Sequence, residues 1–289
     1  MTASVSATPP AHTDHHDRHD HHDRADSTAS AALRVFPLGP VLGAEIDGLD
    51  LAAPLRPPRT DELRRLLAAH KVLLFRGQSI DAAQQLALGR SLGSILDFAA
   101  ASDPDHPGVH LASTLRQPVR RGDGGRATGN WHIDGSGFVA APFASILRPV
   151  TLPPLGGDTV WADLAAAYEG LPSALRTAVE DLYVTHDVTP YFRDRGIDYP
   201  LLARPIVRTH PETGQRVLHV NFALRPQVVG WSAERSTELL AALRGEATRP
   251  EYQLRFRWTA DAVALWDNRA VHHYPVRDYG DFPRRMDRV

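Results

Sequence analysis

The chain has 289 residues, 43% of them hydrophobic and 23% charged, which is an ordinary composition for a globular protein. Its formal net charge of -2 argues against nucleic acid or an anionic membrane as a partner, and the absence of cysteine excludes disulfides, thiolate-bound metals and a thiol nucleophile. No apolar run reaches transmembrane length and the N-terminus lacks the apolar core of a secretory signal, so we expect a cytoplasmic protein.

Residues 1–32 differ from the rest of the chain in composition. The segment is polar, rich in Asp, and contains six of the fifteen histidines: His12, His15, His16, His19, His21 and His22. A segment with so few large apolar side chains cannot bury enough surface to fold. We therefore predict that it is a disordered tail. Such tracts also bind nickel, zinc or copper loosely, which leaves metal handling by the tail as an alternative function.

The next part of the chain alternates between strand and helix patterns. The predicted elements are, in order, strands at 33–39 and 43–51, a helix at 60–71, a strand at 72–77 and a helix at 79–93. Thr60 occupies an N-cap-like position in the first helix, and Gly93 is placed to end the second.

From there on the pattern is mostly that of short strands. Residues 97–129 have little periodicity, and a loop of this length is usually functional or disordered. Strands are predicted at 143–150, 158–164, 217–224, 252–259 and 262–274, with helices at 171–182 and 234–245. This order predicts an α+β domain over residues 33–289, with helices flanking a sandwich or barrel.

The stretch "NWHIDGSGF" contains a candidate metal motif. On a strand, residues two apart face the same way, so His132 and Asp134 would project side by side. An imidazole and a carboxylate are two of the three ligands of the facial triad that binds Fe(II). The pair alone does not define a metal site, because so short a motif often occurs by chance.

A third ligand is available in the C-terminal segment "WDNRAVHHYPVRDYGDFPRRMDRV", which also contains a cluster of arginines. With that segment the sequence resembles the taurine dioxygenase family of Fe(II)- and 2-oxoglutarate-dependent oxygenases. The matching segments are "WHID" (131–134), "LPPLGGDTVWADLAAAYEGLP" (152–172), "RPIVRTHPETGQRVLHVN" (204–221) and "WDNRAVHHY" (266–274), with fainter matches at 43–51 and 70–78.

The resemblance implies a double-stranded β-helix core, also called a jelly roll or cupin-like fold. It also implies Fe(II) as the metal, with 2-oxoglutarate and O2 as co-substrates. The family's second metal-binding histidine lies seven residues after the Trp of its "WDNR" segment, which is His273 here. The neighbouring His272 would point away on a regular strand, although a bulge would exchange the two.

Further positions match co-substrate residues of the family. Arg284 lies eleven residues after His273, where the family has the arginine that binds the distal carboxylate of 2-oxoglutarate. Arg288 matches a second arginine that faces an anionic group of substrate or co-substrate, and Arg285 between them is expected to point outward. Thr159 matches the threonine that donates a hydrogen bond to 2-oxoglutarate.

The implied reaction converts 2-oxoglutarate to succinate and carbon dioxide and hydroxylates a C–H bond of a small molecule. Related halogenases replace the metal-binding carboxylate with a small residue, so Asp134 favours oxygenation. The partners expected are a small-molecule substrate and other copies of the chain, in a dimer or tetramer. The family usually continues past the position of Val289, so contacts from such an extension are not predicted.

The substrate site is predicted from residues near the matching motifs. Phe98 stands where taurine-using relatives have a histidine, and Phe192 and Phe222 are candidate aromatic walls near Gly135. Each phenylalanine taken singly is equally compatible with a core position. Together with Arg288 they predict a pocket with a cationic end and an apolar wall, suited to an organic anion bulkier than taurine.

Three alternatives to the oxygenase remain open from the sequence. Two histidines and a carboxylate also suit hydrolytic zinc. A jelly roll can be a binding module without catalysis, although an intact triad with Arg284 argues against this. The third alternative is a nickel- or zinc-binding protein whose histidine-rich tail handles the metal.

Overall fold

The computed structural model describes residues 32–97, 102–113 and 131–289. The predicted disordered tail and Phe98 lie outside these ranges. Contacts along the chain separate residues 1–32 from a compact unit of residues 33–289, and the fold below is that of the second unit.

No helix in the described part of the chain is both long and apolar enough to cross a membrane.

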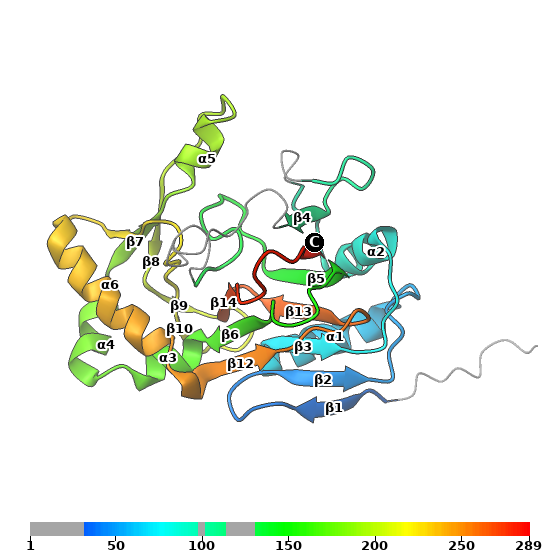
Figure 1. The fold of residues 1–289 in the computed structure, drawn as a ribbon. Coiled ribbons are helices and arrows are strands. Elements are labelled where there is room, and N and C mark those ends of the chain that lie inside the picture. The colour runs from blue at the N-terminus through cyan, green and yellow to red at the C-terminus, as the bar shows by residue number, and fades with distance from the viewer. Residues whose placement is uncertain (1–31, 98–101, 114–130) are drawn as a thin grey trace, which may run out of the picture. The chain divides into compact units, whose positions relative to one another are not determined.

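The larger of the sheets has seven strands (Figure 1). In spatial order they are β1 (Arg34–Pro37), β2 (Ala44–Asp47), β3 (Val72–Phe75), β13 (Val263–Asp267), β5 (Ala144–Thr151), β15 (Arg285–Arg288) and β4 (His110–Ser113). Only the β2–β3 pair is parallel among these strands. The β4 strand lies within the segment 97–129, for which the sequence pattern predicted a loop.

A second sheet contains β12 (Gln253–Phe256), β6 (Thr159–Asp163) and β14 (Val271–Pro275) in that order. Aromatic and aliphatic side chains from both sheets form one core, in which the rings of Trp161 and Trp266 have their centroids 5.6 Å apart. Two sheets that enclose an apolar core in this way form the predicted double-stranded β-helix.

Two helices cover the outer face of the larger sheet, as Figure 1 shows. They are α1 (Pro57–His70) and α2 (Ala82–Leu92). Thr60 is not the N-cap that the sequence pattern predicted, because α1 begins three residues earlier at Pro57, whose fixed φ suits a first helical turn. Helix α2 starts with a capping box between Asp81 and Gln84 and ends at Gly93, as predicted.

A third group of elements packs beside the second sheet. It contains α3 (Leu164–Gly170), α4 (Ser173–Val179), β7 (Tyr183–His186), α5 (Thr189–Arg193), β8 (Leu202–Pro205), β9 (Val207–Thr209), β10 (Arg216–Leu218), β11 (Gln227–Val228), α6 (Ala233–Ala247) and a 3₁₀ turn (Pro250–Tyr252). The strand predicted at 217–224 ends at Leu218. Asn221 accepts a hydrogen bond from the Ala223 amide at 3.1 Å, which turns the chain there. Figure 1 shows α5 at the tip of a projection next to β7 and β8.

Candidate metal centre

The two ends of the candidate triad meet through the backbone. His132 and His273 exchange a pair of N–H···O hydrogen bonds of 3.0 and 2.9 Å, which places residue 132 alongside β14. Ile133 turns into a separate apolar core, so Asp134 returns to the side of His132. The spacing of two residues therefore has the consequence that the sequence predicted.

The metal-binding atoms of His132, Asp134 and His273 all lie within 4.8 Å of one another. The Asp134 Oδ1 atom is 3.8 Å from His132 Nε2 and 3.9 Å from His273 Nε2. Two nitrogen donors and one oxygen donor at these separations fit one divalent ion and match the donor set of the Fe(II) facial triad. The described residues contain no other group of three such donors.

The protonation states also suit a metal. Burial lowers the pKa of His273 well below its usual 6.5, so its ring is neutral at neutral pH. Burial alone would raise the pKa of Asp134, but Arg288 and the two histidines outweigh it and hold that pKa below its ordinary range. Neutral imidazole and ionised carboxylate are the forms that bind metals.

The β6–β14 register separates His273 from His272. His273 lies opposite Trp161 and His272 lies opposite Ala162, so the two imidazoles occupy opposite faces of the sheet. The His272 ring is fully buried rather than on the surface, stacks on Trp131 at 4.7 Å between centroids, and contacts the Ala247 carbonyl at 3.0 Å.

Thr159 lies on the same face of β6 as Trp161, the residue opposite His273. It is opposite Pro275, two positions along the strands from the Trp161–His273 pair. Its hydroxyl accepts a hydrogen bond from Trp258 Nε1 at 3.0 Å, which leaves the hydroxyl proton to donate elsewhere.

The Arg284 side chain contacts the chain just before β6 begins. Its Nε donates to the Gly157 carbonyl at 3.0 Å, and a Cβ at residue 157 would lie only 3.1 Å from the arginine side chain. Burial lowers the pKa of Arg284, yet a guanidinium stays charged in proteins. The buried Arg284 cation and the Thr159 hydroxyl therefore both lie at the N-terminal end of β6.

Arg288 and Arg285 point in different directions. Arg288 Nη1 donates to Asp134 Oδ1, the same oxygen that faces the two histidines. Arg285 instead lies near Asp103 and Asp287, with its side chain 36% exposed. The structure thus brings Arg288 to the triad and pairs Arg285 with two other carboxylates.

Two cavities meet at Asp134. The larger, about 410 Å³, extends past His132, Val188 and Leu224, and the smaller, about 220 Å³, extends past Leu96, His110 and Arg288. Both are lined by Asp134, Gly135, Phe138 and Tyr191. An organic molecule in either cavity would lie beside the metal-binding oxygen.

The predicted substrate residues lie at different distances from these cavities. Gly135 lines both of them. Phe192 stacks on Tyr199 with centroids 3.9 Å apart and contacts the edge of Phe138, and Phe222 packs toward His272. Neither phenylalanine is among the described residues that line the two cavities.

Tyr191 and Leu224 line the cavities in the places where the sequence suggested Phe192 and Phe222. Tyr191 of "TPYFRD" and both Ala223 and Leu224 of "VNFAL" thus line the larger cavity, next to the predicted Phe192 and Phe222. Phe138 was missed altogether, although its place four residues after Asp134 was a usable signal.

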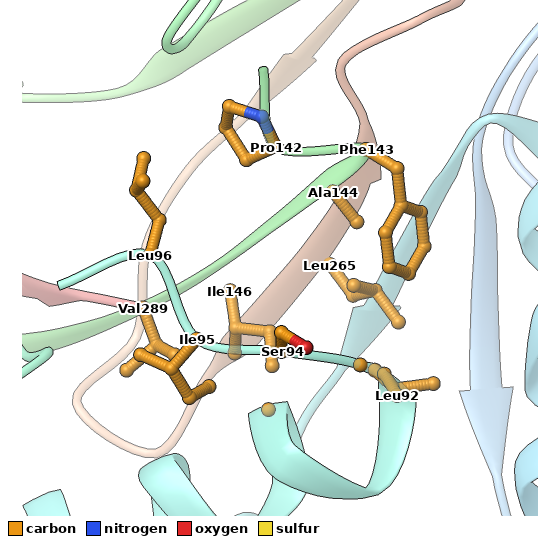
Figure 2. A pocket seen from close by; sticks show the side chains of 12 residues that line it. Leu92, Ser94, Ile95, Leu96, Pro142, Phe143, Ala144, Ile146, Leu265 and Val289 are labelled. Carbon is orange, nitrogen blue, oxygen red and sulfur yellow. The ribbon is translucent and has the colours of Figure 1, made fainter. Parts of the chain in front are cut away.

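Figure 2 shows a third, small cavity of about 70 Å³. Its wall is almost wholly apolar and includes Ile95, Phe143 and Ile146. Leu96, Pro142, Ala144 and Val289 belong both to this wall and to that of the Arg288 cavity. The apolar cavity therefore lies directly behind the cationic one.

In this jelly roll two imidazoles and one carboxylate meet at β14, an arrangement that is typical of Fe(II)- and 2-oxoglutarate-dependent oxygenases. The chain belongs to the taurine catabolism dioxygenase TauD, TfdA family, whose sequence profile matches residues 34–289. It is an oxidoreductase that uses Fe(II), 2-oxoglutarate and O2 to oxidise a small molecule. The zinc-binding and non-catalytic alternatives are not favoured by this membership.

Relatives with named activities match over most of their length. The chain is 36% identical to an alpha-ketoglutarate-dependent sulfate ester dioxygenase of Pseudomonas putida, over 89% of this chain and 88% of the relative. It is 32% identical to an alpha-ketoglutarate-dependent 2,4-dichlorophenoxyacetate dioxygenase of Cupriavidus pinatubonensis, over 82% and 90%. The crystal structure of a taurine dioxygenase from Burkholderia xenovorans superposes with a TM-score of 0.76 at 37% identity, covering 89% of each chain.

Proposed function

We propose that the enzyme oxidises a C–H bond of an organic anion with a bulky apolar body, in a site where His132, Asp134 and His273 hold Fe(II). The observation that supports this most directly is the pair of cavities that meet at Asp134, one with Arg288 in its wall and both with mainly apolar walls. A carboxylate, sulfate or sulfonate would pair with Arg288, because a guanidinium offers two parallel N–H groups to such an anion.

Bound Fe(II) supplies the redox chemistry, in which 2-oxoglutarate becomes succinate and carbon dioxide while O2 oxidises the substrate. The protein residues contribute by position. Thr159 and Arg284 orient 2-oxoglutarate from the β6 side of the triad, and Arg288 orients the substrate anion from the cavity side. Phe138 and Tyr191 exclude water from the space next to Asp134, which strengthens the electrostatic interactions there.

The nature of the walls favours a bulky substrate over taurine. In the cavity that contains Arg288, Asp134 is the sole acidic residue among the described lining residues, and the metal needs it. An ammonium group bound there would be desolvated without a free partner, which costs several kcal/mol. Two relatives are named for a sulfate ester and for 2,4-dichlorophenoxyacetate, and both names describe organic anions.

A succinate-release assay tests this choice. We expect the iron-loaded protein to oxidise an alkyl sulfate or an aryloxyacetate with a kcat/KM at least about 100-fold above that for taurine, since each 1.36 kcal/mol is a factor of ten. Each compound is compared with its uncharged alcohol, which lacks the anion for Arg288. Taurine-dependent sulfite release as fast as turnover of the best anion would contradict the proposal.

We further propose that residues 33–289 form the catalytic domain and that residues 1–32 are a disordered tail. The family profile begins at residue 34, which supports this boundary. A chain that starts at Leu33 is expected to keep the melting temperature and the kcat/KM of the full chain, because a segment that buries nothing adds little stability. A large fall in either quantity would mean that the tail contacts the domain.

Self-association is part of the same proposal. The oligomer that we propose is a dimer or a tetramer. Light scattering during gel filtration measures the mass in solution.

A further inference from the structure

The two carboxylate oxygens of Asp134 have different surroundings. Oδ1 faces His132, His273 and Arg288, as described above. Oδ2 faces the protein interior, where it accepts a hydrogen bond of 2.8 Å from the Ser145 hydroxyl. A hydrogen bond to one oxygen fixes the plane of the carboxylate, so the bond from Ser145 keeps the other oxygen directed at the two histidines.

Ser145 is the last donor in a chain of three hydrogen bonds that ends at Asp134. Trp266 Nε1 donates to Asn268 Oδ1 at 2.9 Å, and Asn268 Nδ2 donates to the Ser145 Oγ atom at 2.9 Å. An indole N–H can only donate, so it forces the amide oxygen of Asn268 toward Trp266 and the amide nitrogen toward Ser145. The Ser145 oxygen then accepts, and its single proton is directed to Asp134.

The fold places these groups together and buries them almost fully. Ser145 on β5 lies directly opposite Trp266 on β13. The backbone N–H of Asn268 donates to the Phe143 carbonyl at 2.8 Å. Ser145 is 4% exposed, Asn268 2% and Trp266 not at all. Hydrogen bonds in such a buried chain polarise one another.

We propose that Ser145 and Asn268 are positioning residues that fix Asp134 with Oδ1 toward the metal. Trp266 and Asn268 belong to the "WDNR" segment, so the same short segment that leads to His273 would also orient the carboxylate ligand. The proposal rests on the proposed role of Asp134 as a metal ligand. Groups that orient metal ligands in this way typically change metal affinity about 10–100-fold when removed.

The test measures the binding of Mn(II) alone by calorimetry, without turnover. Ser145→Ala is expected to weaken Mn(II) binding about 10–100-fold, and Ser145→Thr, which keeps the hydroxyl, is expected to restore most of the affinity. Asn268→Leu should weaken binding less than Ser145→Ala. Asn268→Leu should add nothing in the Ser145→Ala background, because its effect passes through the serine.

Ser236→Ala is the matched control. Ser236 is also a buried serine with hydrogen bonds, to Gln227 and Val228, but it belongs to α6. Its loss is expected to lower the melting temperature and leave Mn(II) binding unchanged. Wild-type Mn(II) affinity in Ser145→Ala would overturn the proposal, and so would equal losses in Ser145→Ala and Ser236→Ala. If Ser145→Ala does not fold, the affinity of Asn268→Leu decides.

Asp134→Ala separates the two proposals. Loss of Mn(II) binding in this variant supports the ligand role of Asp134 independently of Ser145. Retained binding in Asp134→Ala would refute the proposed ligand set itself. Lost binding there together with unchanged affinity in both Ser145→Ala and Asn268→Leu would refute only the positioning role.

Discussion

His273→Ala is expected to reduce both substrate oxidation and Mn(II) binding below detection, whereas His272→Ala keeps most of both. The His273 ring is buried, neutral and 3.9 Å from Asp134 Oδ1, so its loss leaves two donors where three are needed. The His272 ring lies on the opposite face of β14 and stacks on Trp131. Its loss creates a cavity in the core and should appear chiefly as a lower melting temperature.

The comparison requires three measurements on the same two variants: succinate release, Mn(II) affinity and thermal unfolding. Both variants should unfold at a lower temperature because both rings are buried, but only His273→Ala should bind no metal. The opposite pattern, with metal binding lost in His272→Ala and kept in His273→Ala, would show that β14 contains a bulge and that the register is displaced by one residue.

The triad was predictable because it depends on local rules. His132 forms a single bridge to His273, and the turn that begins at Asp134 brings its carboxylate to the same side as the His132 ring. Alternation along β14 separates His273 from His272. Both relations span at most two residues along the chain, so neither depends on tertiary packing or on the path of a long loop. The family spacing from Trp266 then identified which histidine to choose.

The cavity walls were less predictable, because they depend on short irregular elements. Tyr191 and Phe192 lie in α5, a helix of five residues, where adjacent side chains point about 100° apart rather than to opposite faces. Phe138 was not predicted because side chains in the turn that begins at Asp134 follow neither strand nor helix periodicity.

Ser145 could not have been found from the sequence at all. A serine in a strand is commonplace, and its role depends on a strand 121 residues further along the chain, since Trp266 pairs with it across the sheet. The contact between Arg288 and Asp134 spans 154 residues and is likewise a product of the completed sheet. Such long-range contacts are fixed by tertiary packing, which one sequence does not display.

Arg284→Ala is expected to raise the KM for 2-oxoglutarate sharply, while Arg285→Ala changes it less than about twofold, as is usual for exposed charges. Arg284 is 6% exposed and oriented by the Gly157 carbonyl, at the end of β6 where Thr159 lies. Removing a hydrogen bond to a charged group costs about 1.5–3 kcal/mol, which corresponds to roughly a 10–150-fold higher KM. Arg285 has the same charge one residue away, but its partners are Asp103 and Asp287.

Mn(II) binding in the absence of 2-oxoglutarate distinguishes a co-substrate role of Arg284 from a structural one. A residue that only binds 2-oxoglutarate leaves the affinity for the metal alone unchanged, so Arg284→Ala should match the wild type there and differ only when the co-substrate is titrated. Arg284→Lys should recover part of the affinity, because an ammonium supplies the charge without the two-pronged geometry of guanidinium. Equal rises in KM for Arg284→Ala and Arg285→Ala would contradict the assignment, since both would then reflect a general loss of positive charge.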